Sequence, residues 1–441
     1  IERSTCCENT ATEHAMMARL MIDSAVIWAR DYRIDSFRFD LMGHQPRAAM
    51  ERLQAAVNTA TGRHIHLIGE GWNFGEVADG RRFVQASQLS LSASGIGTFS
   101  DRARDAARGG SPGDSGRALV ARQGWLSGLH YLPNAESGPG SRAELLAAAD
   151  LVRVGLAGTL RDYRMQAADG QIRRLEELRY GSSPAGYVHT PGEVVNYVEN
   201  HDNQTLYDGL VMKLPRDLPM AERVRVQALG NAIVAFSQGI AYLHAGQEIL
   251  RSKSLDRNSY NSGDHFNPLD LSLADNGFGR GLPPAWDNRS SWPWMRPLLA
   301  DPALKPSPEH LRHARDLVLD LFAIRQSSKL FRLPDAQSVR RRLTLLNTGP
   351  EQIPTLLVGH LDGRNLVDAG FAELVYAINV APTAATLTLP TLAGRAWQLH
   401  PVHLREGAAD PRPREVSSVD AETGRFTVPP RTALVWVVMP R

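Results

Sequence analysis

The chain has 441 residues, of which 43% are hydrophobic and 22% charged, a composition close to that of ordinary globular proteins. Its net charge is only +2, so electrostatics give no reason to expect nucleic acid or a membrane surface as a partner, and a neutral, polar substrate fits this balance. The length favours two domains, one of them large. The cysteines, Cys6 and Cys7, are adjacent and poorly placed for a disulfide, which leaves the redox compartment open.

The first predicted elements are a helix, a strand and a second helix. Thr10 to Glu13 resembles a capping box, and apolar residues at helical spacing predict a helix over about 12–31. The strand ends in Phe37-Arg38-Phe39-Asp40, where alternation puts Arg38 and Asp40 on the face opposite the two phenylalanines. The second helix is predicted over 46–62.

Three predicted strands end in acidic residues. Besides the strand before Asp40, an apolar run over 64–69 ends at Glu70, and a run over 194–198 leads to Asp202. A helical pattern at 220–237 and a further strand at 239–243 follow. Alternating strands and helices favour a parallel sheet of βα units, and polar groups at the strand C-termini are typical of the active face of an α/β barrel.

The remaining segments complete a barrel-like part and then change character. Loops are predicted at 109–116, 134–142 and 181–192, a long active-face loop at 252–296, and a closing helix at 307–326. After residue 333, short β-rich runs at 374–378, 385–389 and 433–438 are separated by turn residues, which predicts a β-sandwich. We therefore predict an α/β domain over 1–332 and an all-β sandwich domain over 333–441.

The strand-end acids fit the chemistry of glycoside cleavage, which requires two carboxyl groups in different protonation states. The spacing of Asp40 and Glu70 is close to one βα repeat, so the two residues fit adjacent strands. Arg38 beside Asp40 favours the ionised form that a nucleophile requires. Trp72 near Glu70 would raise the pKa of Glu70 and keep it protonated, as a general acid requires. Asp202 adds a third acid, and His201 beside it can donate to sugar hydroxyls.

Simpler interpretations exist for each of these residues. A single Asp after a strand is usually a helix N-cap, Arg38 could be a structural ion-pair partner, and Trp72 could belong to the core. Three strand-end acids together favour a catalytic site. His201-Asp202 also resembles the paired ligands of metal phosphohydrolases, although His189 and His244 lack ligand-like spacing and no metal site is predicted.

Three motifs occur in order along the chain, at 35–44 (DSFRFDLMGH), 69–76 (GEGWNFGE) and 198–202 (VENHD). They resemble the second, third and fourth conserved regions of the α-amylase superfamily in its pullulanase and limit-dextrinase form. Flanking segments that match the same group lie at 4–14, 95–102 and 259–267. The resemblance runs over nearly the whole chain.

The resemblance implies a role for each matching residue. Asp40 corresponds to the nucleophile, Glu70 to the general acid/base, and Asp202 to the acid that holds substrate hydroxyls and stabilises the transition state. Substrate-binding or supporting positions are Arg38, His201, Trp72, Asp264 and Asn267. Ser36 and His265 stand where the family usually has Gly and Trp, which would shift the subsite preference.

The resemblance also implies a fold, a reaction and partners. The fold would be the second half of a (β/α)8 barrel followed by the β-sandwich. The reaction would be hydrolysis, with retention of configuration, of α-1,6 branch linkages in pullulan, amylopectin, glycogen or limit dextrins. A branched α-glucan is the expected partner of a monomer that requires no cofactor, with Ca²⁺ as a conceivable structural ion and with no nucleic acid or membrane involved. Alternatives are another glucan hydrolase of the superfamily and a non-catalytic glucan-binding protein.

The family's first conserved region and first three barrel strands have no counterpart here. We expect them upstream of Ile1, together with any targeting segment, so these residues assign the protein neither to secretion nor to the cytoplasm. Half a barrel would leave a sheet edge unpaired and a core exposed. We therefore expect this C-terminal piece alone to be inactive or poorly folded.

Overall fold

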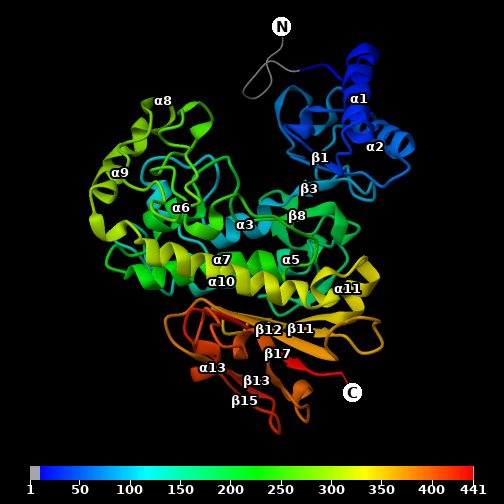
Figure 1. The fold of residues 1–441 in the computed structure, drawn as a ribbon. Helices are drawn as coiled ribbons and strands as arrows, with labels where there is room; N and C mark the ends of the chain where they lie inside the picture. Colours follow the sequence, from blue (N-terminus) through cyan, green and yellow to red (C-terminus); the bar gives the residue numbers. More distant parts are fainter. Residues whose placement is uncertain (1–9, 441) are drawn as a thin grey trace.

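The computed structural model describes residues 10–440, and Cys6, Cys7 and the start of the 4–14 motif lie outside the described residues. Figure 1 shows three tiers along the molecule. Helices α1 (Ala15–Arg30) and α2 (Arg47–Thr61) form one end, α7 (Met220–Phe236) and α10 (Pro308–Gln326) cross the middle, and antiparallel strands form the other end. No helix among the described residues has the length and apolar character needed to cross a membrane.

A five-stranded parallel sheet carries the strand ends that were predicted to be functional. Its spatial order follows the chain: β1 (Ser36–Phe39), β2 (His66–Gly69), β3 (Gly97–Phe99), β8 (Val194–Asn196) and β9 (Ile240–Ala241). Every neighbouring pair is parallel, which is the arrangement of a half barrel. Within the described part of the chain, β1 and β9 each pair on one side only. The coarse architecture, a parallel half-barrel sheet followed by antiparallel sheets, is therefore as predicted.

The register between β1 and β2 aligns the two predicted catalytic positions. Phe39 lies opposite Gly69, so Asp40 and Glu70 both follow directly at the carboxyl edge of the sheet. Phe37 and Phe39 pack against the apolar cluster under α1 and α2, which confirms the predicted alternation along β1.

The first helix lies within the predicted range of about 12–31, but the predicted capping box at its start is wrong. The N-cap of α1 is His14, without a side-chain capping bond, so Thr10 to Glu13 is not a capping box. The hydroxyl of Thr12 instead donates a hydrogen bond to the buried Oε1 atom of Gln45. By contrast, α2 ends as predicted, because Gly62 adopts φ 65, a left-handed conformation that glycine allows at a helix C-terminus.

The chain forms further helices besides those that were predicted. The loop prediction for 252–296 is partly wrong, because α8 (Ala285–Asn288) and the start of α9 (Trp292–Leu299) fall inside it. The other helices are α3 (Asp101–Arg108), α4 (Ala118–Ala121), α5 (Arg142–Leu156), α6 (Leu206–Lys213), α11 (Ala336–Arg342), α12 (Pro401–Leu404) and α13 (Arg412–Val416). Two small hairpins pair β4 (Arg164–Gln166) with β5 (Ile172–Arg174) and β6 (Arg179–Tyr180) with β7 (Ser183–Pro184).

The C-terminal part contains two antiparallel sheets. The five-stranded sheet has the order β10 (Leu343–Leu346), β11 (Leu356–Asp362), β12 (Glu373–Asn379), β17 (Thr432–Val438) and β14 (Gln398–Leu399). The three-stranded sheet has the order β13 (Ala385–Thr388), β16 (Arg425–Val428) and β15 (Ser418–Asp420). An apolar cluster that includes Trp397, Phe426 and Trp436 packs between the strands of both sheets.

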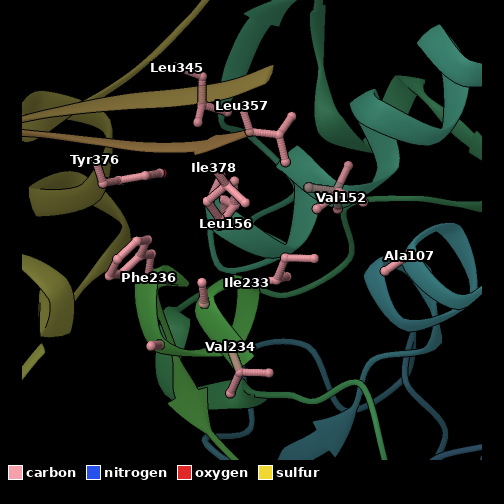
Figure 2. Close-up of a cluster of buried hydrophobic side chains, with 14 of the residues drawn as sticks. Ala107, Val152, Leu156, Ile233, Val234, Phe236, Leu345, Leu357, Tyr376 and Ile378 are labelled. Atoms are coloured by element: carbon pink, nitrogen blue, oxygen red, sulfur yellow. The ribbon is translucent and has the colours of Figure 1, made fainter. Parts of the chain in front are cut away.

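One core joins the helical part to the antiparallel strands. Figure 2 shows Val152 and Leu156 of α5 and Ile233 of α7 close to Leu357 and Ile378 of the five-stranded sheet. These residues belong to a single buried cluster. The predicted domain boundary at 332/333 falls inside the region of sequence that contributes to this cluster, and it stays a prediction.

Candidate active site

Arg38 connects the two carboxylates that were predicted to be catalytic. Its Nη1 atom lies 2.5 Å from Oδ1 of Asp40, and its Nη2 atom lies 3.2 Å from Oε1 of Glu70. The guanidinium also lies over the ring of Phe99, 5.9 Å from its centroid. Asp40 and Glu70 therefore share one cation and point to the same side of the sheet.

The environments of the two carboxylates differ strongly. The side chain of Asp40 is 67% exposed, whereas that of Glu70 is 6% exposed. Burial raises the pKa of Glu70, and the negative charges of Asp202 and Asp40 raise it further, against the opposing effects of the Leu41 amide and Arg38. Two acids in such different surroundings suit two different roles in acid–base chemistry.

The backbone after β1 holds Glu70 in place. The amide of Leu41 donates a 2.8 Å hydrogen bond to Oε2 of Glu70, and Leu41 takes a left-handed φ of 46 to do so. The amide of Gly43 donates to the Glu70 carbonyl at 2.8 Å. A Cβ atom at Gly43 would lie 2.2 Å from the carbonyl oxygen of Trp72, so the close approach of these two loops requires glycine.

Asp202 and His201 lie on the loop between β8 and α6. The ring Nε2 atom of His201 is 3.7 Å from Oδ1 of Asp202, and its Nδ1 atom is 3.0 Å from Oδ1 of Asn200. Tyr242, just after β9, donates to the same Asn200 oxygen at 2.8 Å. Burial lowers the pKa of His201, although Asp202 opposes this shift.

A cleft of about 610 Å³ opens at this end of the sheet. Glu70, Trp72 and Asp202 are among the residues that line the cleft. Arg38 and His201 are not, but they contact Glu70 and Asp202, and Asp40 is connected to the lining through Arg38. The size and the mixture of aromatic and polar side chains are typical of a small-molecule or oligomer site.

A cation sits between two aromatic rings in the cleft wall. Arg104 of α3 lies 5.9 Å from the ring centroid of Trp72 and 5.4 Å from that of Tyr197. Its Nε atom pairs with Asp105 at 2.6 Å, and Asp105 accepts a 2.5 Å hydrogen bond from the hydroxyl of Tyr180. Trp72 is therefore part of the cleft wall, and it also packs against the small apolar cluster of Phe99, Val195 and Tyr197.

The comparisons with known proteins agree with each other. A family described as "Alpha-1,6-glucosidases, pullulanase-type, C-terminal" matches residues 273–439. The chain is 42% identical to chloroplastic pullulanase 1 of Arabidopsis thaliana over 99% of the chain and 46% of that protein, and 42% identical to the pullulanase of Klebsiella pneumoniae over 92% of the chain and 37% of that protein. The crystal structure of PulA from Klebsiella oxytoca superimposes with a TM-score of 0.91 and 39% identity, covering 99% of the chain and 41% of that structure.

This chain is a relative of the pullulanases. It spans less than half the length of the two curated pullulanases given above. A solved complex of PulA from Klebsiella pneumoniae with maltotriose is similarly close, with a TM-score of 0.90 and 40% identity over 98% of the chain and 46% of that structure.

Asp264 and Asn267 lie farther along the pullulanase-like sequence, outside the lining of the cleft. Asp264 is exposed. The Asn267 side-chain amide donates to the carbonyls of Ser259 and Gly263 at 2.8 and 2.9 Å, so it holds its own loop together. The Asn267 carbonyl accepts a 2.6 Å hydrogen bond from the Arg251 guanidinium, so the loop is also held to the chain segment that precedes it.

The described residues contain no group of three or more His, Cys, Asp or Glu side chains that could hold a metal ion. His244, one of the histidines available for a phosphohydrolase-type site, instead pairs through Nδ1 with Oε1 of Glu199 at 2.7 Å. The phosphohydrolase interpretation therefore has no ligand set in residues 10–440.

Two features of the pullulanase-like cleft were missed in the sequence. Asp101 follows the short strand β3 and lines the cleft, so it is a fourth strand-end acid. The pattern that identified the other three acids would have found it if residues 97–99 had been predicted as a strand. Arg104 had no such signal, because its place between two aromatic rings depends on how α3 docks.

Proposed function

We propose that this chain carries the catalytic carboxylates of a retaining glycosidase that cleaves α-1,6 linkages in branched α-glucans such as pullulan, amylopectin, glycogen or limit dextrins. The observation that carries the proposal is the pair of strand-end carboxylates, Asp40 and Glu70, bridged by Arg38 beside a cleft that Asp202 also lines. The pullulanase relatives support the type of linkage. The maltotriose bound by a similar PulA structure supports a glucan as the ligand.

The proposed reaction proceeds in two displacements. Glu70, whose protonated form is favoured by burial because burial raises its pKa, gives its proton to the glycosidic oxygen while a carboxylate oxygen of Asp40 attacks the anomeric carbon. The bond to the leaving sugar breaks and a covalent glycosyl-Asp40 ester forms. Glu70, now ionised, then takes a proton from water, whose oxygen displaces Asp40 with overall retention. Asp202, with His201 beside it, stabilises the positively charged transition state and holds substrate hydroxyls.

The test is hydrolysis of pullulan by the full-length protein, with analysis of products. Release of maltotriose with retained configuration supports the proposal, and release of other products would favour another glucan hydrolase of the superfamily. In the Asp40→Asn variant we expect the rate to fall by at least about 10³-fold, since the nucleophile is lost. Undiminished hydrolysis by this variant would exclude Asp40 as the nucleophile, and glucan binding without hydrolysis in the wild type would favour a binding protein.

Among residues 10–440, β1 and β9 each have a strand partner on one side only, which bears on whether the chain is active by itself. A closed barrel pairs every strand on both sides, so we propose that further strands complete this sheet in the active protein. We expect the 441-residue chain by itself to hydrolyse pullulan poorly compared with the full-length protein. Equal rates per mole in a side-by-side assay would contradict this expectation. The role of Ca²⁺ as a structural ion is tested by comparing the melting temperature with and without a chelator.

A further inference from the structure

A buried polar segment passes behind the loop that carries Asp202. Residues Ser252 to Asp256 are each 1% exposed or less, although four of the five have polar side chains. Leu250, Ser254 and Leu255 have φ values of 58, 53 and 67, a left-handed conformation that is costly for residues other than glycine. Such a segment persists only where tertiary contacts hold it, so its contacts indicate what it supports.

The second residue of this segment, Lys253, contacts the backbone next to Asp202. The Nζ atom of Lys253 donates a 2.8 Å hydrogen bond to the carbonyl oxygen of His201. That carbonyl belongs to the peptide unit that joins His201 to Asp202. Lys253 therefore holds the main chain immediately before the acid, without touching the carboxylate.

The ammonium of Lys253 is balanced by buried acids. Asp208 of α6 is fully buried and accepts hydrogen bonds from the Ser252 hydroxyl at 2.5 Å and from the Lys253 amide at 2.8 Å. Asp208, Glu199 and Asp256 all favour the charged form of Lys253, whereas burial disfavours it. A buried cation with this support is a fixed element of the structure and not a flexible surface side chain.

Arg251, the residue just before this segment, is connected through His244 to Glu199, near the start of the loop between β8 and α6. Its Nη1 atom is 3.3 Å from Nε2 of His244, which pairs with the fully buried Glu199, and its Nη2 atom donates to the carbonyl of Asn267. Glu199 also accepts a 2.7 Å bond from the amide of Leu206, the first residue of α6. The segment thus fixes both ends of the loop between β8 and α6.

We infer that Lys253 is a positioning residue for Asp202: its hydrogen bond to the His201 carbonyl fixes the peptide that carries Asp202 relative to Glu70 across the cleft. This inference rests on the proposed role of Asp202 in glucan hydrolysis. The side chain of Asp202 is 48% exposed, and its ion-pair contact is with the ring of its neighbour His201, at 3.7 Å. The backbone is therefore the means by which its position is set.

The test is a double-mutant cycle in the full-length protein with Lys253→Met, Asp202→Asn and both changes, assayed on pullulan. We expect Lys253→Met to lower kcat about 10- to 100-fold while KM changes less than about threefold, because a displacement of about 1 Å at a reacting group has this effect. In the Asp202→Asn background, the same change should lower kcat by less than about threefold, since the residue that Lys253 positions is already lost.

A matched control is Arg325, which is another buried cation. It donates hydrogen bonds to the carbonyls of Ala235, Ser237 and Gly239, which lie just before β9, at the end opposite the cleft. Arg325→Met should lower the melting temperature but leave kcat within about twofold of the wild type at a temperature well below that transition. If Lys253→Met does not fold, Asp208→Asn, which keeps the shape and weakens the charge balance, takes its place in the cycle.

The outcomes distinguish a failure of the positioning role of Lys253 from a failure of the proposed glucan hydrolysis. Equal losses in both backgrounds, or an unchanged kcat for a folded Lys253 or Asp208 variant, would overturn the positioning role while leaving the proposed function intact. A wild-type protein that does not cleave pullulan would overturn the proposed function itself, irrespective of the cycle.

Discussion

At the scale of single residues, the contrast between Glu70 and the two aspartates is the feature that organises the site. Glu70 is buried beneath the Leu41 amide and Arg38, while Asp40 and Asp202 are about half or more exposed. The sequence predicted Trp72 as the apolar neighbour that raises the pKa of Glu70. The cause in the structure is the burial of Glu70 as a whole, reinforced by the charges of Asp202 and Asp40.

The raised pKa of Glu70 predicts the alkaline limit of activity. The first displacement requires protonated Glu70, so activity is lost as the pH rises through this pKa, and a raised pKa extends the active range upward. Glu70→Gln should lower kcat/KM by about 10²- to 10⁴-fold and remove this limb from the pH profile. An unchanged alkaline limb in the residual activity of the variant would assign the limb to another group.

Arg38 should shift the same limb in a predictable direction. Its positive charge lowers the pKa of Glu70, so Arg38→Met should raise that pKa and move the alkaline limb of kcat/KM to higher pH. The overall rate should fall as well, because Asp40 loses its partner. A limb that moves to lower pH would show that Arg38 does not act on Glu70 through its charge.

At the scale of secondary-structure elements, the docking of α3 shapes the cleft wall that holds Arg104. The amides of Trp125 and Leu126 donate to the carbonyls of Ala106 and Ala107 at the end of α3. The indole Nε1 of the fully buried Trp125 donates at 2.7 Å to the carbonyl of Pro354, just before β11. The cleft wall is thus anchored to the antiparallel sheet.

This anchor predicts the cost of changing Trp125. Trp125→Phe should lower the free energy of unfolding by about 1–3 kcal/mol, because the partly buried Pro354 carbonyl loses its donor. Trp125→Ala should lower it by about 3–5 kcal/mol through the added cavity. Urea denaturation measures both, and Trp286→Phe, at a position that is 52% exposed, serves as the control with an expected change within about 0.5 kcal/mol. Equal effects at the two tryptophans would contradict the anchoring.

Elements with clear periodicity could be predicted from the sequence, and short or long-range features could not. β1 and α2 were predicted correctly because β1 alternates Phe37 and Phe39 with polar residues and α2 stops at Gly62. β3 was missed because three residues, Gly97–Phe99, carry too little pattern. Arg38, Asp40 and Glu70 were associated because they lie at adjacent strand ends. Lys253 was not recognised, because its contact with His201 bridges 52 positions of sequence that only the folded chain brings together.

At the scale of the whole molecule, the helical part and the antiparallel strands share apolar side chains. Residues of α5, α7, α10 and β10 to β12 belong to one buried cluster. Ion pairs reinforce the junction, including those of Glu222 on α7 with Arg412 and Arg431 at 2.8 and 2.6 Å. Neither part buries its own apolar surface fully without the other.

Deletion of residues 333–441 should therefore prevent cooperative folding of the remainder. The exposed faces of α5 and α7 would present apolar surface to water, so we expect dye binding typical of exposed apolar surface and no sharp thermal transition. Calorimetry on the truncated and intact proteins measures the difference. A truncated protein that melts in one sharp transition would show that the two parts are independent domains.

The shared apolar cluster also constrains how this protein can be recombined with its relatives. A chimera joined at 332/333 would mate α5 and α7 from one parent with β10 to β12 from another, so side-chain volumes selected together would be separated. Phe236, Phe331 and Tyr376, whose rings lie 5.4 to 6.3 Å apart, come from both sides of that junction. A working crossover would have to exchange this aromatic trio and the facing helices as one block, although the segments involved are distant in sequence.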